Sequence, residues 1–410
     1  MAILDYIYRK FINLGVFSRI LLVIVKPLAL WLSIQFDTDA GLALAQIYLI
    51  GLLFMSLSGT NAHRPFYQIY FGDGEYLASK SVARSYVNYI QKITLQLIFV
   101  IILLLLVASF VFWDMFDIVI TGILFGIAEK LNDEFQRYAQ FRNNSQNLFY
   151  LALSKLIPIL IAALLSYTLV VDIRFAFPVL LLTGSIILNF QTIFSAISFF
   201  IKITRKSVFL MIKKSFNYIK QDVIQISCVF MGISLISFDK WLLQFFAMTD
   251  LPIYMLCTQI ASIFIVTQTI ILIAPIRARL VTENPQDIKS IKIGSPIISL
   301  ISLLLGIVIY YYYNSEEDYR NITYFAFFFA AIITFSVAYT ERLYWATTAG
   351  IRLALDSVIV ASFIFSVVVL KMFLNVPNFI ELSLGLLFCL MCIRVIVMIY
   401  MLGKYRVNKN

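Results

Sequence analysis

Two basic residues stand inside a long apolar stretch near the N-terminus. The run Phe17–Gln35 is apolar and long enough to cross a bilayer. It nevertheless contains Arg19, Lys26 and Pro27. A cation that faces lipid near the middle of a membrane helix costs about 2.5–3.5 kcal/mol. Because Arg19 and Lys26 are two helical turns apart, they share one face, which is expected to look into a protein interior or a water-filled cavity.

Six cations lie inside the predicted membrane spans once those assigned to the inner and outer segments are set aside. They are Arg19, Lys26, Lys130, Lys155, Lys240 and Arg394. Facing lipid, they would together cost roughly 15–20 kcal/mol, which exceeds the net stability of a domain, about 5–15 kcal/mol. Most must therefore be paired, hydrated or snorkelling. Lys155 and Arg394 lie in the inner third of their spans and are expected to snorkel to the interface. Lys26 and Lys130 lie nearest the middle, which makes them the strongest functional candidates.

Carboxylates gather at the inner end of the fourth predicted span. The charged residues there follow helical spacing: Glu129, Asp133 and Arg137, and likewise Lys130 with Glu134. Two interpretations stay open. The segment is either a helix end that emerges into the cytoplasm with its own ion pairs, or the wall of a polar cavity. On the second interpretation, Glu129 and Asp133 are candidates to bind a coupling ion, H⁺ or Na⁺.

Further charges fall in the second half of the chain. Asp239 and Lys240 lie in the outer half of the seventh predicted span. Adjacent residues on a helix do not face each other, so each is expected to need a separate partner or a polar cavity. Asp239 is a third candidate for a coupling ion. A group near the inner ends of two later spans fits either an ion pair that closes an inner gate or a plain interfacial cluster: Glu341, Arg342, Arg352 and Asp356.

Motifs of enzyme chemistry are missing from the sequence. His63 is its single histidine, which gives no support for histidine-based acid–base chemistry. The run Gly74–Ser81 resembles a P-loop but lacks the second glycine and a preceding strand. Cys389 and Cys392 share a helix face without a histidine to complete a metal site. The sequence therefore predicts a protein that is not an enzyme and has no metal or organic cofactor.

Helical membrane spans are the elements that must position these charges. The chain has 410 residues, of which 61% are hydrophobic and 13% charged, against about 25% charged in soluble domains. The apolar runs do not alternate as barrel strands do, so an all-α integral membrane protein is predicted. Gly122 and Gly126 predict a close helix–helix contact. We expect about twelve spans, at 16–35, 41–59, 93–113, 117–139, 148–171, 176–200, 223–246, 251–274, 293–313, 322–344, 350–373 and 377–402.

The loops predict the orientation and the domains. With the N-terminus inside, 23 of the 32 Lys and Arg residues fall in inner segments and 3 in outer loops. This bias predicts that both termini are cytoplasmic, and it accounts for the net charge of +10 without nucleic acid. The basic stretch 202–222 is predicted to be an amphipathic linker on the inner leaflet. It separates a six-helix lobe over 1–201 from a second over 223–410.

Four features carry a family resemblance. The first span opens with Asn13-Leu-Gly-Val-Phe and contains Pro27. Six spans precede and six follow a basic amphipathic segment. The fourth span is charged at its inner end and is followed by Asn147-Leu-Phe-Tyr-Leu-Ala-Leu-Ser-Lys. Phe238-Asp-Lys-Trp-Leu-Leu, which leads into Leu251-Pro-Ile-Tyr, looks like the family motif Asp-Arg-x-x-Leu, with Lys240 where Arg is usual. The chain thus resembles bacterial polysaccharide flippases of the multidrug/oligosaccharidyl-lipid/polysaccharide exporter superfamily.

The resemblance implies two six-helix lobes around a central cationic cavity and alternating access. The substrate would be an undecaprenyl-pyrophosphate-linked repeat unit of O-antigen, capsule or exopolysaccharide, moved from the inner to the outer leaflet of the bacterial cytoplasmic membrane. Membrane lipids and other polysaccharide assembly proteins would be its partners. The substrate-binding candidates are Arg19, Lys26, Lys130 and Lys240.

Two other functions are weighed against this one. A multidrug exporter of the same superfamily would want carboxylates and aromatic rings for cationic drugs. The excess of intramembrane Lys and Arg argues against it, whereas Glu129, Asp133 and Asp239 favour it. A membrane enzyme of polysaccharide assembly predicts long outer loops with Arg and His, which the sequence lacks.

Overall fold

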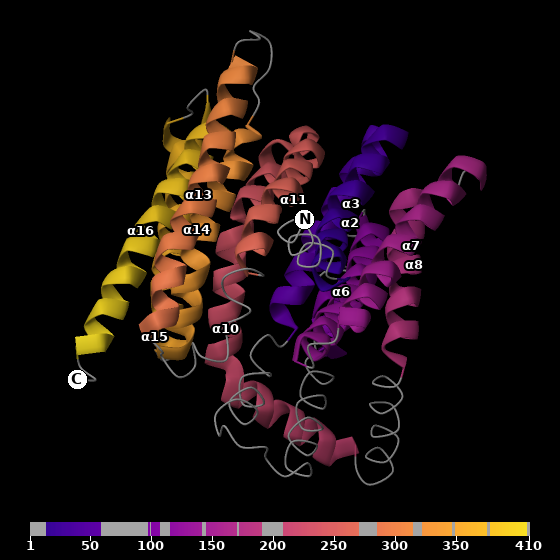
Figure 1. Cartoon of the computed structure of the whole chain (residues 1–410), viewed down its shortest axis with the longest axis horizontal. Coiled ribbons are helices and arrows are strands. Elements are labelled where there is room, and N and C mark those ends of the chain that lie inside the picture. Colours follow the sequence, from indigo (N-terminus) through magenta and orange to yellow (C-terminus); the bar gives the residue numbers. More distant parts are fainter. Residues whose placement is uncertain are drawn as a thin grey trace, which may run out of the picture. The chain divides into compact units, whose positions relative to one another are not determined.

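The computed structural model describes residues 14–58, 97–98, 100–106, 115–141, 145–169, 172–190, 208–269, 285–314, 322–346, 349–374 and 378–407. Within these ranges every regular element is helical, as Figure 1 shows. The long helices are α2 (Leu14–Phe36), α3 (Thr38–Leu57), α6 (Phe116–Phe141), α7 (Ser145–Leu169), α8 (Ile173–Leu188), α10 (Val208–Phe246), α11 (Leu251–Gln268), α13 (Pro285–Asn314), α14 (Tyr324–Ala346), α15 (Ala349–Val369) and α16 (Phe379–Val407). The short turns η2 (Met248–Asp250) and η4 (Leu370–Leu374) complete them.

Each predicted span coincides with helix in the described residues. Between α3 and α6, residues 97–98 and 100–106 are helical and occupy the predicted third span. Six of the described helices are long and apolar enough to cross a membrane. Their apolar stretches are Thr38–Leu57, Gln146–Thr168, Met248–Gln268, Ile293–Tyr312, Gly350–Met372 and Phe379–Gly403. The predicted all-α, multi-pass membrane protein is thereby confirmed.

The chain divides into two compact units, and among the described residues the boundary lies between Ile219 and Lys220. Unit 1 holds α2 to α8, and unit 2 holds α11 to α16. The boundary falls inside α10, a single helix of 39 residues. The predicted linker 202–222 is therefore helical over its described part and continues without interruption into the predicted seventh span.

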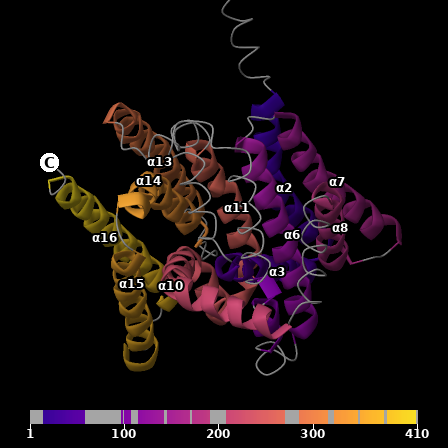
Figure 2. The same cartoon turned by 90° about the horizontal axis from the view of Figure 1, so that it is seen from below.

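The helices of unit 1 form a closed sequence of contacts. Helix α3 packs on α2 and α6, α8 packs on α6 and α7, and α7 packs back on α2. Figures 1 and 2 both show α7 and α8 side by side. Phe54 of α3, Val119 and Ile123 of α6 and Val100 and Leu104 of the preceding helical segment form a buried cluster. This packing fixes α6, which carries two of the three candidates for a coupling ion, Glu129 and Asp133, against α3.

Small residues allow the close approach of α3 and α6. A Cβ on Gly126 would lie 2.6 Å from Phe54 Cδ1, and one on Gly122 would lie 2.6 Å from Ile50 Cγ2. A Cβ on Gly51 would likewise lie 2.6 Å from Phe125. All three distances are shorter than real Cβ contacts. The predicted helix packing at Gly122 and Gly126 is confirmed.

Helix α14 occupies the centre of unit 2. It packs on α11, α13 and α16, and α16 also packs on α15. Hydroxyl groups of α13 bond to carbonyls of α14: Ser299 Oγ donates to Ala331 O at 2.7 Å and Ser302 Oγ to Phe327 O at 3.0 Å. Such interhelical bonds are worth about 0.6 kcal/mol each in membrane proteins. Val395, Met398 and Leu402 of α16 form a buried cluster against α14 and α15.

The glycine contact of α6 gives a test of this packing. Gly126→Ala should lower the free energy of unfolding by about 1–3 kcal/mol because the new methyl group meets the fully buried Phe54 ring. The measurement is thermal or denaturant unfolding of the purified protein in detergent micelles.

Gly385→Ala in α16 is the matched control, because nothing lies within 4 Å of a Cβ at that position. It should be neutral or stabilising by up to about 1 kcal/mol through helix propensity. Equal behaviour of the two variants would contradict the close approach of α3 and α6.

Candidate functional site

Lys26 lies on α2 at a local break in the helix hydrogen bonds. The following residue, Pro27, has no N–H group, so the carbonyl of Val23 loses its usual helical donor. Tyr48 of α3 donates its hydroxyl to the Lys26 carbonyl at 3.2 Å. The backbone of α2 is thus tied to α3 at the position from which the Lys26 side chain projects.

Three charged side chains from three helices of unit 1 meet at one point. Lys26 Nζ of α2 lies 2.8 Å from Glu129 Oε2 of α6, and Lys155 Nζ of α7 lies 2.9 Å from Glu129 Oε1. The side chains of Glu129 and Lys155 are each 11% exposed, whereas that of Lys26 is 35% exposed. Two ammonium groups therefore share one carboxylate, and the three groups together carry one surplus positive charge. We call these residues the Lys26–Glu129–Lys155 cluster.

An aromatic layer lies against this cluster. Lys26 Nζ is 5.6 Å from the centroid of the Phe125 ring. That ring stacks on Tyr48 with centroids 4.9 Å apart and meets Phe177 of α8 at 6.3 Å. Phe125, Tyr48 and Phe177 are all buried. The Phe125 ring attracts the Lys26 ammonium group by a cation–π interaction.

The neighbouring polar residues of α6 also have partners. Lys130 is buried, and its Nζ lies 3.0 Å from Glu134 Oε1, so the predicted pair at i, i+4 is confirmed. Asn132 is fully buried and donates to Ser185 Oγ of α8 at 2.8 Å. Asp133 also takes part in a polar interaction. The ion pair and burial of Lys130 leave Lys26 as the most exposed ammonium group of the cluster and its surroundings.

The expectation that Lys155 snorkels to the membrane interface is wrong. Its side chain is buried and donates to Glu129 across 26 positions of sequence. The ion pair replaces hydration by water at the interface. Sequence spacing gave no sign of it because α6 and α7 come together only through tertiary packing. Glu129 in turn bonds to other helices, which departs from the interpretation of α6 as a helix end stabilised by its own pairs.

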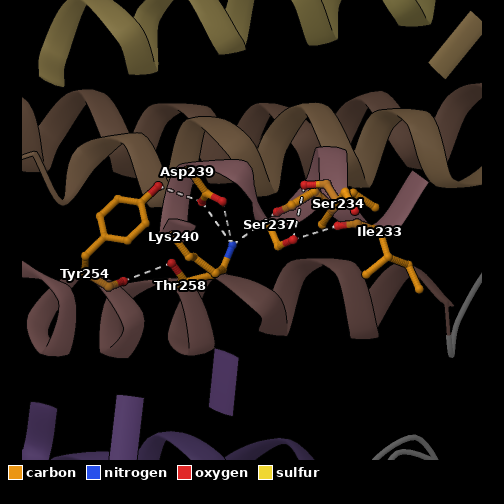
Figure 3. A network of polar contacts seen from close by, with 8 residues as sticks. Ile233, Ser234, Ser237, Asp239, Lys240, Tyr254 and Thr258 are labelled. Atoms are coloured by element: carbon orange, nitrogen blue, oxygen red, sulfur yellow. Dashed lines mark hydrogen bonds and ion pairs between the residues drawn. The ribbon is translucent and has the colours of Figure 1, made fainter. Parts of the chain in front are cut away.

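Unit 2 contains a second polar network, on α10 and α11 (Figure 3). Lys240 Nζ lies 2.9 Å from Oδ1 and 3.0 Å from Oδ2 of Asp239. It also donates to the Ile236 carbonyl at 3.2 Å. Tyr254 of α11 donates its hydroxyl to Asp239 Oδ2 at 2.8 Å. Asp239, Lys240 and Tyr254 are all buried. The network has no net charge, because the ammonium group of Lys240 balances the carboxylate of Asp239.

This network corrects the expectation that Asp239 and Lys240 each need a separate partner. Their Cβ atoms diverge on the helix, but the four-carbon stem of lysine is long and flexible enough to bring its ammonium group back to the adjacent carboxylate. Asp239 does accept from a separate group as well, the hydroxyl of Tyr254.

A further buried ion pair joins α15 to α16. Arg394 Nε lies 2.6 Å from Asp356 Oδ1, and its Nη2 lies 3.3 Å from Oδ2. Arg394 was expected to snorkel, and this expectation is also wrong, since its side chain is 7% exposed. The fork of the guanidinium matches the two carboxylate oxygens. Of the four gate candidates, Asp356 thus pairs across helices, and Arg352 is buried one turn before it.

Other predicted residues lie outside the described side chains: Arg19, Glu341 and Arg342. Their participation in binding or gating stays a prediction. Conversely, sequence reasoning interpreted Lys155 and Arg394 as snorkelling cations, and it named Tyr254 only within the run Leu251-Pro-Ile-Tyr, without a role. For the two cations a signal was available, since each is an ionisable residue within an apolar helix, and such residues face a protein interior as a rule. Tyr254 had no comparable signal among 23 tyrosines.

Comparisons with known proteins add little to these observations. No protein-family model and no curated protein matches the sequence. Among solved structures, the chain is similar to the crystal structure of the eukaryotic MATE transporter AtDTX14. The sequences are 12% identical, the TM-score is 0.47, and the match covers 93% of this chain and 92% of that chain. A likeness at this level does not assign a family or a substrate.

The described charged clusters differ in charge balance and in exposure. The described clusters contain ammonium, guanidinium, carboxylate and phenol groups already engaged with one another. Among the described residues, no group of three or more His, Cys, Asp or Glu side chains is placed to hold a metal ion. The Lys26–Glu129–Lys155 cluster differs from the other two because it has both surplus charge and an exposed member.

The Asp356–Arg394 pair gives a test of the buried charges. Asp356→Asn should lower the free energy of unfolding by about 3–5 kcal/mol because it leaves the Arg394 guanidinium buried without its counter-ion. The double variant Asp356→Leu with Arg394→Met should regain most of this loss. Denaturant unfolding in mixed micelles measures both.

Asp172→Asn provides the control, since it removes the charge from an exposed ion pair with Arg174 but keeps a side chain able to cap α8. Its effect should stay below about 1 kcal/mol. A loss for the double variant as large as that for Asp356→Asn would show that packing, not charge, holds this region.

Proposed function

We propose that this protein is a membrane transporter that carries an anionic, lipid-linked substrate between leaflets. The substrate proposed is an undecaprenyl-pyrophosphate-linked oligosaccharide, moved from the inner to the outer leaflet of a bacterial cytoplasmic membrane by alternating access. The single observation that supports this is the Lys26–Glu129–Lys155 cluster. It holds a surplus positive charge within an apolar helical unit and exposes one ammonium group, that of Lys26.

The chemistry of a pyrophosphate suits this cluster. A diphosphate carries at least two negative charges and many acceptor oxygens, so its passage through hydrocarbon without partners is prohibitive. Lysine is a common phosphate ligand and donates charge-assisted hydrogen bonds. Moving such a molecule across the bilayer breaks no covalent bond, which agrees with the lack of catalytic motifs in the sequence.

Energy coupling is the second part of the proposal. Glu129 and Asp239 are carboxylates within buried networks, and a change in their protonation or the binding of Na⁺ would alter the charge of each network. Asp133 remains a further candidate on α6. Lys240 is proposed to contribute in unit 2 once its pairing with Asp239 is relieved.

Export of organic cations is the second candidate function. It is favoured by the aromatic layer of Tyr48, Phe125 and Phe177, because organic cations bind to aromatic faces. Against it, the carboxylates of Glu129 and Asp239 are each already paired with lysine ammonium groups. A cationic drug would have to compete with these fixed cations.

Deletion and complementation in the host test the function. Loss of the gene should remove a surface polysaccharide and cause the lipid-linked oligosaccharide to accumulate on the cytoplasmic side. Wild type should restore the glycan, whereas Lys26→Met should restore about a tenth of it or less, because it removes the exposed ammonium group. Glycan and lipid-linked intermediates are quantified at matched membrane levels of each protein.

Arg174→Met is the matched control. Arg174 also belongs to unit 1, is 33% exposed, pairs with a carboxylate and lies 4.9 Å from the Phe175 ring centroid. It should complement as wild type does. A deletion strain with normal glycan and new sensitivity to cationic dyes would instead support the second candidate function.

A further inference from the structure

We propose that Glu129 is a built-in counter-ion that stays paired with Lys26 until substrate binds. Lys155 is then the positioning residue that allows the substrate anion to replace Glu129 at Lys26, an event called the exchange below. The inference rests on the proposed function, and it concerns how the binding cation is kept ready. Neither the pairing of Glu129 with two lysines nor a role for Lys155 follows from the sequence pattern.

The two oxygens of the Glu129 carboxylate have different partners. Each of its oxygens is held by one ammonium group, Oε2 by Lys26 and Oε1 by Lys155. An anion that approaches Lys26 therefore competes with one oxygen only. When it displaces that oxygen, Glu129 keeps its contact with Lys155 and is not left as an unpaired charge in an apolar surrounding, which would be costly.

The three side chains of the cluster differ in exposure. Lys26 is about three times as exposed as its two partners, 35% against 11%. A ligand can reach Lys26, while Lys155 is enclosed with Glu129 between α6 and α7. Lys155 is thus placed to hold the counter-ion and not to touch the substrate.

The net charge of the cluster depends on Lys155. With Lys155 present, the cluster has a net charge of +1 and attracts an anion. Without it, Lys26 and Glu129 would form a neutral pair, and the carboxylate would repel a phosphate as strongly as the lysine attracts it. Lys155 therefore converts a closed ion pair into a site with surplus positive charge. Pro27 and the Tyr48 hydroxyl, which fix the α2 backbone at Lys26, keep the exposed ammonium group within reach of Glu129.

A set of charge-neutralising variants tests the exchange through the sign of each effect. The full-length protein in phosphatidylcholine nanodiscs is titrated with inorganic pyrophosphate by calorimetry at low ionic strength, where screening is weak. Lys155→Met should weaken binding about tenfold, because Glu129 then neutralises Lys26. Glu129→Gln should tighten it several-fold, because the competing carboxylate is lost. The double variant Glu129→Gln with Lys155→Met should bind at least as tightly as wild type.

A purely structural cluster predicts a different pattern. In that case Glu129→Gln and Lys155→Met would both weaken binding in proportion to their loss of thermal stability, and the double variant would be the weakest. This result would overturn the inference. Where a single variant does not fold, the double variant decides alone. Binding tenfold weaker than wild type contradicts the exchange, and equal or tighter binding supports it.

Failure of the inference and failure of the proposed function can be told apart. Lys26→Met should abolish binding, and Arg174→Met should leave it unchanged. If wild type binds pyrophosphate no better than Lys26→Met does, the anion-transport function itself fails. If Lys26→Met loses binding but Glu129→Gln also weakens it in a stable protein, the function stands and only the counter-ion role is wrong.

Discussion

A charge buried in an apolar helical protein must have a partner, and this requirement organises the structure. Unpaired, each ion would cost several kcal/mol, and five of the described intramembrane cations lie beside carboxylates: Lys26, Lys130, Lys155, Lys240 and Arg394. The pairs at Lys240 and Arg394 are balanced. The cluster at Glu129 is not balanced, since this one carboxylate contacts two lysine ammonium groups. On the proposed function, this local imbalance is what would distinguish the anion-binding cluster from the balanced ion pairs.

The sequence predicted the helices well because their signal is continuous. Around twenty apolar residues in a row leave few alternatives to a membrane helix, and the glycines at 122 and 126 correctly indicated a close contact. The site was predicted only in part. Lys26 and Glu129 were both identified, yet their contact was not, because it depends on how α2, α6 and α7 pack. Lys155 was misjudged from its depth in the helix, since depth does not tell which way a side chain faces.

The error at Asp239 and Lys240 has a different origin. The rule that adjacent residues point apart describes Cβ directions, and it holds for short side chains. A lysine ammonium group is separated from its Cβ by three further methylene groups, which let it return to its neighbour. Helical spacing therefore predicts partners for Asp and Asn better than for Lys. The bond between Tyr254 and Asp239 was not predicted for a simpler reason, because a tyrosine gives no sequence sign of its hydroxyl partner.

The charges of α6 bear on how the chain enters the membrane during synthesis. Although 26 residues long, α6 is not among the helices apolar enough to cross by composition, and its ionisable groups oppose partition of the isolated segment into lipid. Lys26 of α2 is translated before Glu129, whereas Lys155 follows it by 26 residues. Until α7 has emerged from the ribosome, Glu129 therefore has only one of its two lysine partners, and the surplus positive charge of the cluster arises only when α7 packs beside α6.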